Sequence, residues 1–152
     1  MLLYGCEKPG TMENLWNCGE MNASPDDPME HHQPCKKGSQ ILYGWAMDAP
    51  DLTLPKDVGF RVGEDTRINY LVLQVHYNQL DMIPPEGDHS GILLHYTRQP
   101  LPKTAGVLLL GTGGFAPAHT TTFFETACMM DDEREIHPFY FRTHTHKLGM
   151  FS

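Results

Sequence analysis

The chain has 152 residues, with 11 Lys and Arg against 19 Asp and Glu, so its formal charge is -8. This acidic balance excludes the basic surface that binding to nucleic acid or to anionic lipid requires. The longest apolar runs, such as 70–75 and 107–110, are far shorter than the roughly 20 residues that cross a bilayer, so we expect no direct membrane contact from this segment. Nine His and nine Met supply many possible ligands for soft and borderline metals.

Residues 7–39 are polar, contain many Pro and Gly, and show no period, which predicts a long loop. None of the four cysteines has the Cys-x-x-Cys spacing of zinc or thioredoxin-type sites, so disulfides are predicted. A bridge between Cys6 and Cys35 would close the loop and contribute about 3 to 4 kcal/mol on the chain-entropy model. Asn22 begins an Asn-x-Ser triplet and is a candidate glycosylation site. Because residues 1–6 do not resemble a signal peptide, the chain is either cytosolic or an internal piece of a longer secreted protein.

The rest of the chain predicts short β-strands separated by turns rich in Pro and Gly, with no sustained helical period. The predicted strands are 41–46, 58–62, 68–77, 91–97, 105–111, 120–128 and 135–146. This pattern indicates an all-β protein built as an antiparallel β-sandwich. Two prolines within 98–103 suggest a junction between domains at 1–99 and 100–152. Neither part contains enough strands for a complete two-sheet sandwich, which favours a fragment spanning the end of one domain and the start of the next.

The segment 68–77 alternates so that Gln74 and His76 share one face. Both faces are mostly apolar, which predicts a central strand. His76 can be interpreted as a metal ligand or as a hydrogen-bonded histidine of the core, and one imidazole cannot hold copper or zinc by itself.

The sequence Arg142-Thr143-His144-Thr145-His146 ends the last predicted strand. In a strand, side chains at i and i+2 point to the same face about 7 Å apart, so His144 and His146 can converge on one metal ion. The alternative is a pair of exposed histidines on a polar face. His137, in the same segment, is a candidate for indirect support of such a site or for a structural role.

Six motifs in order along the chain resemble the copper type II, ascorbate-dependent monooxygenases, and within them the peptidylglycine α-hydroxylating branch. They are Met1-Leu2-Leu3-Tyr4-Gly5-Cys6, Ile41-Leu42-Tyr43-Gly44-Trp45-Ala46, 54–63, Leu73-Gln74-Val75-His76-Tyr77, Ser90-Gly91 and 142–149. The resemblance covers nearly the whole chain.

The resemblance implies two tandem β-sandwich domains of jelly-roll type, each holding one copper. It implies that His76 is a ligand of the electron-transfer copper, and that His144 and His146 are ligands of the oxygen-binding copper. Ascorbate would reduce both ions, and dioxygen would be used to hydroxylate the glycine α-carbon of glycine-extended peptides, the first step of C-terminal amidation. Arg142 matches the clamp for the peptide carboxylate, and Gln74 is a candidate for indirect support of His76. The location implied is the secretory pathway, in the granule lumen or outside the cell.

The chain also departs from the family pattern. Two further histidine ligands would stand immediately before Met1, and a methionine ligand lies beyond Ser152, so we expect the fragment to need the missing flanking parts of the same chain and to be inactive alone. The family partners of Cys18 and Cys128 also fall outside it, and His89 stands where relatives often have Cys.

Two alternatives remain open. One is the dopamine or tyramine β-hydroxylating branch of the same family, against which Arg142 argues. The other is a secreted copper-binding β-sandwich without turnover.

Overall fold

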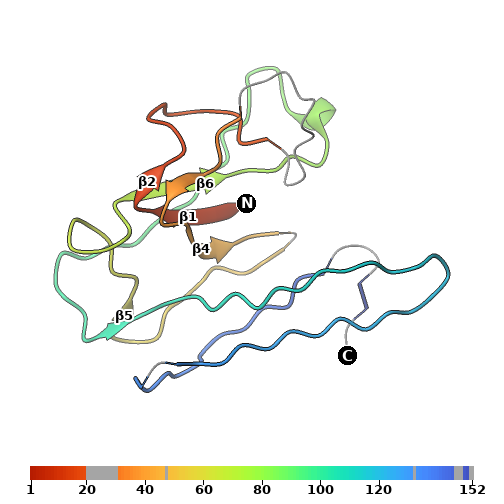
Figure 1. Ribbon diagram of the computed structural model, residues 1–152. Coiled ribbons are helices and arrows are strands. Elements are labelled where there is room, and N and C mark those ends of the chain that lie inside the picture. The colour runs from red at the N-terminus through yellow and green to blue at the C-terminus, as the bar shows by residue number, and fades with distance from the viewer. Residues whose placement is uncertain (20–30, 47, 132, 146–148, 151–152) are drawn as a thin grey trace. The chain divides into compact units, whose positions relative to one another are not determined.

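The computed structural model describes residues 1–19, 31–46, 48–131, 133–145 and 149–150 (Figure 1). The chain divides into two compact units, Met1–Val107 and Leu108–Ser152. Every strand of the described residues lies in the first unit. The strands are β1 Leu2–Cys6, β2 Lys8–Pro9, β3 Cys35–Lys37, β4 Gln40–Gly44, β5 Val58–Gly59, β6 Tyr70–Gln74 and β7 Lys103–Thr104. A short 3-10 helix, η1 Leu80–Met82, lies between β6 and β7. In the described part of the chain, no helix is long and apolar enough to cross a membrane.

The main sheet has the order β4-β1-β6 and is antiparallel throughout (Figure 1). Its central strand, β1, is absent from the predicted strands. One cluster of buried side chains joins Leu3 to Leu42 and Ile68, and a second joins Cys6 to Cys35 and Val72. Because successive side chains of β1 point to opposite faces, Leu3 and Cys6 carry these two separate clusters.

The all-β, antiparallel prediction is confirmed by these sheets and by the scarcity of helix in the described residues. β4, β5 and β6 fall on three of the predicted strands, but each is shorter than predicted at its C-terminal end. β5 is reduced to two residues and pairs in parallel with β7.

The prediction of an unbroken loop at 7–39 is wrong, because β2 and β3 pair within it. The predicted disulfide joins Cys6, the last residue of β1, to Cys35 within this segment, and their Cα atoms are 5.3 Å apart. Cys6 is completely buried and Cys35 nearly so, so the bridge forms part of the core. Cys18 and Cys128 are free thiols.

The prediction that 68–77 forms a central strand is also wrong, because β6 pairs only with β1 in the described part of the chain and lies at the edge of the main sheet. The apolar side chains suggested burial on both faces, but the two faces differ in exposure. Val72 is buried, whereas Leu71 on the opposite face is 45% exposed.

Residues 91–97, 105–111, 120–128 and 135–145 form no strand in the described structure, contrary to prediction. Their apolar side chains are largely exposed, and Phe123 and Phe141 are each 88% exposed. A period of two favours a strand only where a neighbouring strand completes the hydrogen bonds and a second layer covers the apolar face. The described residues provide neither for these segments.

Candidate functional site

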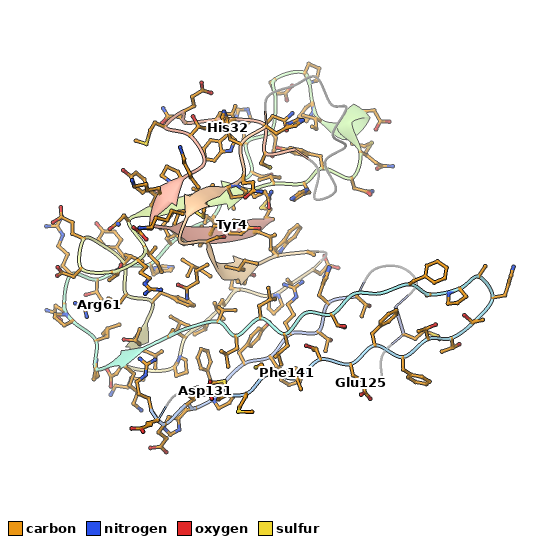
Figure 2. All side chains as sticks on the ribbon, viewed as in Figure 1. Tyr4, His32, Arg61, Glu125, Asp131 and Phe141 are labelled. Atoms are coloured by element: carbon orange, nitrogen blue, oxygen red, sulfur yellow. A yellow bond between two sulfur atoms is a disulfide. The ribbon has the colours of Figure 1, made fainter. Side chains whose placement is uncertain are left out.

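The C-terminal end of β6 carries Gln74, the only polar side chain among the buried residues of the described structure. The Tyr4 hydroxyl on β1 donates a hydrogen bond to its Oε1 over 3.2 Å, and its Nε2 donates to the Cys18 sulfur over 3.1 Å. Figure 2 shows Tyr4 on the central strand of the sheet. Gln74 therefore has partners for both ends of its amide, as a buried polar group requires.

Burial raises the pKa of the Tyr4 phenol above its ordinary value of 10.0, and the nearby Cys18 raises it further. The phenol therefore stays protonated and acts as a donor to Gln74 throughout the neutral range. The connection between Tyr4, Gln74 and Cys18 thus holds the end of β6 from two sides.

His76 follows β6 by two residues and is exposed, so the structure does not support its interpretation as a buried histidine of the core. The next residue, Tyr77, donates a hydrogen bond from its hydroxyl to Asp88 Oδ2 over 2.7 Å. The Ser90 backbone N–H donates to Asp88 Oδ1 over 2.9 Å. The chain on both sides of His76 is therefore held by side-chain hydrogen bonds.

These contacts shift the pKa values of both Asp88 and Tyr77. Hydrogen bonds from the Ser90 side chain, the Tyr77 hydroxyl and the Ser90 N–H lower the pKa of Asp88 from 3.8 to about 2, with a smaller contribution from His89. The same bond to Asp88 is the main reason that the pKa of Tyr77 is raised. At neutral pH the pair is a carboxylate accepting from a protonated phenol.

Pairing of β1 with β6 brings the start of the chain beside this region. The antiparallel register places Leu2 opposite Gln74 and Leu3 opposite Leu73. On the other side of β1, Met1 is anchored to Trp45 by two hydrogen bonds, of 2.7 Å from its amino group and 2.8 Å to its carbonyl oxygen.

Arg142 and His144 lie in the second unit, and both side chains are exposed. His146, predicted to share a metal with His144, lies outside the described residues, as does the glycosylation candidate Asn22. His137 Nε2 lies 3.4 Å from the Glu135 carboxylate, and both side chains are largely exposed. The roles predicted for these residues stay predictions.

The described residues do not by themselves make a complete copper site. No group of three or more His, Cys, Asp or Glu side chains in the described part of the chain is arranged to hold a metal ion. Imidazole is a suitable donor for copper, and His76 and His144 each expose one. The donor chemistry fits copper, whereas the number of donors is too small, so further ligands are needed at each position.

Two residues of this region, Tyr4 and Asp88, are absent from the sequence-based site. Asp88 stands two residues before Ser90, and Gly87 and Gly91 flank the segment 88–90, a composition typical of an Asx turn, so this signal could have identified it. Tyr4 carries no such signal, because its partners are 70 and 14 residues away along the chain.

The antiparallel sheet and the exposed imidazoles of His76 and His144 define a class of β-sheet proteins with candidate metal ligands. Two family models match this sequence: the N-terminal domain of the copper type II ascorbate-dependent monooxygenases over residues 1–84, and the C-terminal domain of the same enzymes over residues 103–151. The chain belongs to the copper type II ascorbate-dependent monooxygenase family. The predicted junction between residues 99 and 100 stays a prediction.

Three relatives show how the similarity is distributed. The chain is 37% identical to peptidyl-glycine alpha-amidating monooxygenase of Mus musculus over 98% of its length, and 34% identical to peptidyl-glycine alpha-amidating monooxygenase A of Xenopus laevis over the same share. It is 33% identical to dopamine beta-hydroxylase of Rattus norvegicus over 72% of its length. The chain spans only 14%, 15% and 19% of these relatives. No solved structure matches it.

Proposed function

We propose that this chain is part of a copper- and ascorbate-dependent monooxygenase that hydroxylates the α-carbon of the C-terminal glycine in glycine-extended peptides. The peptidylglycine enzymes support this substrate class, because they match 98% of the chain, whereas dopamine beta-hydroxylase matches 72%. The structural observation that supports the proposal is the β1–β6 register, which sets the N-terminal end of β1 opposite Gln74, two residues before His76.

His76 is the proposed ligand of the electron-transfer copper. If the register of Leu2 with Gln74 continues by two residues, the position immediately before Met1 lies opposite His76. Directly opposed residues of an antiparallel pair are about 4.5 to 5.5 Å apart, close enough for two imidazoles to bind one ion. The family resemblance implies two histidines directly before the residue that matches Met1, and the second of them would stand at the position that the extended register sets opposite His76.

His144 and His146 are the proposed ligands of the oxygen-binding copper, and Arg142 is the proposed clamp for the peptide carboxylate. A guanidinium two residues from the ligands can hold a carboxylate through two parallel hydrogen bonds and so orient the neighbouring glycine. Bound copper, one ion at each position, would supply the one-electron chemistry that links ascorbate to dioxygen. His137 and Gln74 are proposed to support the ligands indirectly.

The proposed location is the secretory pathway, in a granule lumen or outside the cell, with a glycan at Asn22. The disulfide between Cys6 and Cys35 supports this, because disulfides persist in oxidising compartments. Flanking parts of a longer chain are the proposed source of the remaining copper ligands.

The proposed role of His76 can be tested by adding His-His directly before Met1 and titrating with Cu(II). Nitrogen hyperfine coupling in electron paramagnetic resonance should show several imidazoles on one ion, and His76→Ala should remove one of them. His95→Ala is the matched control. If His76→Ala leaves the spectrum unchanged, the assignment of His76 is wrong.

The substrate class is tested with a full-length form of the enzyme by following ascorbate-dependent oxygen consumption. A glycine-extended peptide should stimulate it, and phenethylamines should not. Stimulation by phenethylamines alone would favour the dopamine-hydroxylating alternative, and copper binding without oxygen consumption would favour a binding protein without turnover.

A further inference from the structure

The hydrogen bond from Tyr77 to Asp88 joins two parts of the chain that no strand pairing connects. β6 ends at Gln74, and between residues 75 and 91 the described structure contains only η1 and the turn in which the Gly87 N–H donates to the Pro84 carbonyl over 2.8 Å. The Tyr77 hydroxyl and Asp88 Oδ2 lie 2.7 Å apart across this segment. This contact therefore links the residue three positions after β6 to the other end of the segment 75–91.

Asp88 is well suited to be the fixed end of this contact. One carboxylate oxygen accepts from the Ser90 N–H, which sets the side chain in an Asx turn, and the other accepts from Tyr77. A carboxylate held by several donors stays ionised, and a hydrogen bond to an ionised acceptor is stronger than one between neutral groups.

The contact matters because His76 lies between two anchored residues. Gln74 is buried and held by Tyr4 and Cys18, and Tyr77 is held by Asp88. Consecutive Cα atoms are about 3.8 Å apart across a planar peptide, so fixing Tyr77 restricts the peptide that carries His76. The imidazole itself is exposed, and no strand pairing holds it in the described structure.

We propose that Asp88 is a positioning residue for His76, acting through the Tyr77 hydroxyl. The inference rests on the proposed role of His76 as a copper ligand. A ligand that is pre-positioned loses less conformational freedom when the ion binds. The hydrogen bond between Tyr77 and Asp88, called the tether below, therefore serves copper binding more than the stability of the fold. Tyr77 and Asp88 are both exposed, and exposed polar contacts add little to overall stability.

The test measures the order of His76 and the stability of the fold separately. Tyr77→Phe removes only the hydroxyl, Asp88→Ala removes the acceptor, and Asp88→Asn keeps one acceptor oxygen. Tyr96→Phe is the matched control, since Tyr96 is 84% exposed. In the copper-free chain, the NMR order parameter of the His76 amide should fall from about 0.85 toward about 0.6 in Tyr77→Phe and Asp88→Ala, and less in Asp88→Asn. Thermal unfolding at neutral pH should change only slightly in all four variants, because exposed polar contacts add little to stability.

A second measurement uses the form with His-His before Met1. Its Cu(II) hyperfine splitting should change in Tyr77→Phe and Asp88→Ala, and the double variant should match either single variant because both remove the same contact. If Cu(II) binds through His76 and neither the order parameter nor the spectrum changes, the positioning role is wrong and the proposed function stands. If Cu(II) does not bind through His76 but the order parameter falls, the tether exists and its purpose for copper is wrong.

Discussion

The hydroxyl of Tyr4 donates a hydrogen bond to the side-chain oxygen of Gln74, 3.2 Å away, and links the middle of β1 to the last residue of β6. Tyr4→Phe would leave that oxygen buried without its donor, because Gln74 is only 8% exposed. We expect a loss of about 1 to 2 kcal/mol in the free energy of unfolding, measured by urea denaturation. Tyr96→Phe should change it by less than about 0.5 kcal/mol. Equal effects of the two substitutions would show that the Tyr4 contact does not stabilise the fold.

Gly5 packs against Ile68 so closely that an added Cβ would lie 2.7 Å from its Cγ2. Ile68 is β-branched and buried beside Leu3 and Leu42, so it has little room to turn away. Gly5→Ala should destabilise the protein by about 1 to 3 kcal/mol, as overpacking in a core usually does.

Two further variants test that cause. Gly91→Ala is the matched control, because an added Cβ there meets nothing within 4 Å. Ile68→Ala, which removes the Cγ1, Cγ2 and Cδ1 atoms that the added Cβ would meet, should relieve part of the cost when combined with Gly5→Ala. Strict additivity of the two substitutions would contradict the steric explanation.

The Cys6–Cys35 disulfide closes a loop with a sequence separation of 29 residues. Replacing both cysteines by Ser should lower the free energy of unfolding by about 2 to 5 kcal/mol, and reduction of the unmodified chain should have a similar effect. Cys128→Ser should be neutral, since Cys128 is a free and exposed thiol. A chain that unfolds at the same urea concentration with and without reductant would contradict the prediction.

The ionisation of Asp88 predicts that its contribution to the stability of the fold depends on pH only in acid solution. Its pKa in the folded protein is about 2, below the ordinary 3.8, so the ionised form is the one that folding stabilises. This contribution is complete above about pH 4 and is lost as the pH falls toward about 2. Carboxyl-carbon NMR should give a midpoint near 2, and Tyr77→Phe should move it upward but not fully to 3.8, because Ser90 still donates. An unchanged midpoint in Tyr77→Phe would show that the phenol does not stabilise the carboxylate.

The proposed carboxylate clamp predicts a specific kinetic defect. In a full-length form of the enzyme, Arg142→Gln should raise the KM for a glycine-extended peptide by at least about tenfold, because a charge-assisted bidentate contact is worth about 1.5 to 3 kcal/mol. The KM of the same variant for the same peptide ending in glycinamide, which keeps the glycine but lacks its carboxylate, should hardly change. Arg98→Gln, at another exposed arginine, is the control. An unchanged KM for the glycine-extended peptide would refute the clamp.

Several features follow from the sequence alone. The spacing of Cys6 and Cys35 around a polar segment predicted their disulfide, and the short apolar segments between turns rich in Pro and Gly predicted an all-β protein. Six ordered motifs identified the family to which the two family models assign the chain. These features are local, or depend on the order of residues along the chain, and so they can be read without coordinates.

Other features were decided only by the tertiary structure. The central position of β1 and the edge position of β6 depend on strand pairing, and the contacts of Gln74 with Tyr4 and of Tyr77 with Asp88 join residues 70 and 11 positions apart in the sequence. The alternating segments between 105 and 145 form no strand in the described structure, although their pattern predicts strands. Alternation specifies which side chains share a face, but a strand exists only when another strand completes its hydrogen bonds, and the identity of that neighbour is a property of the fold.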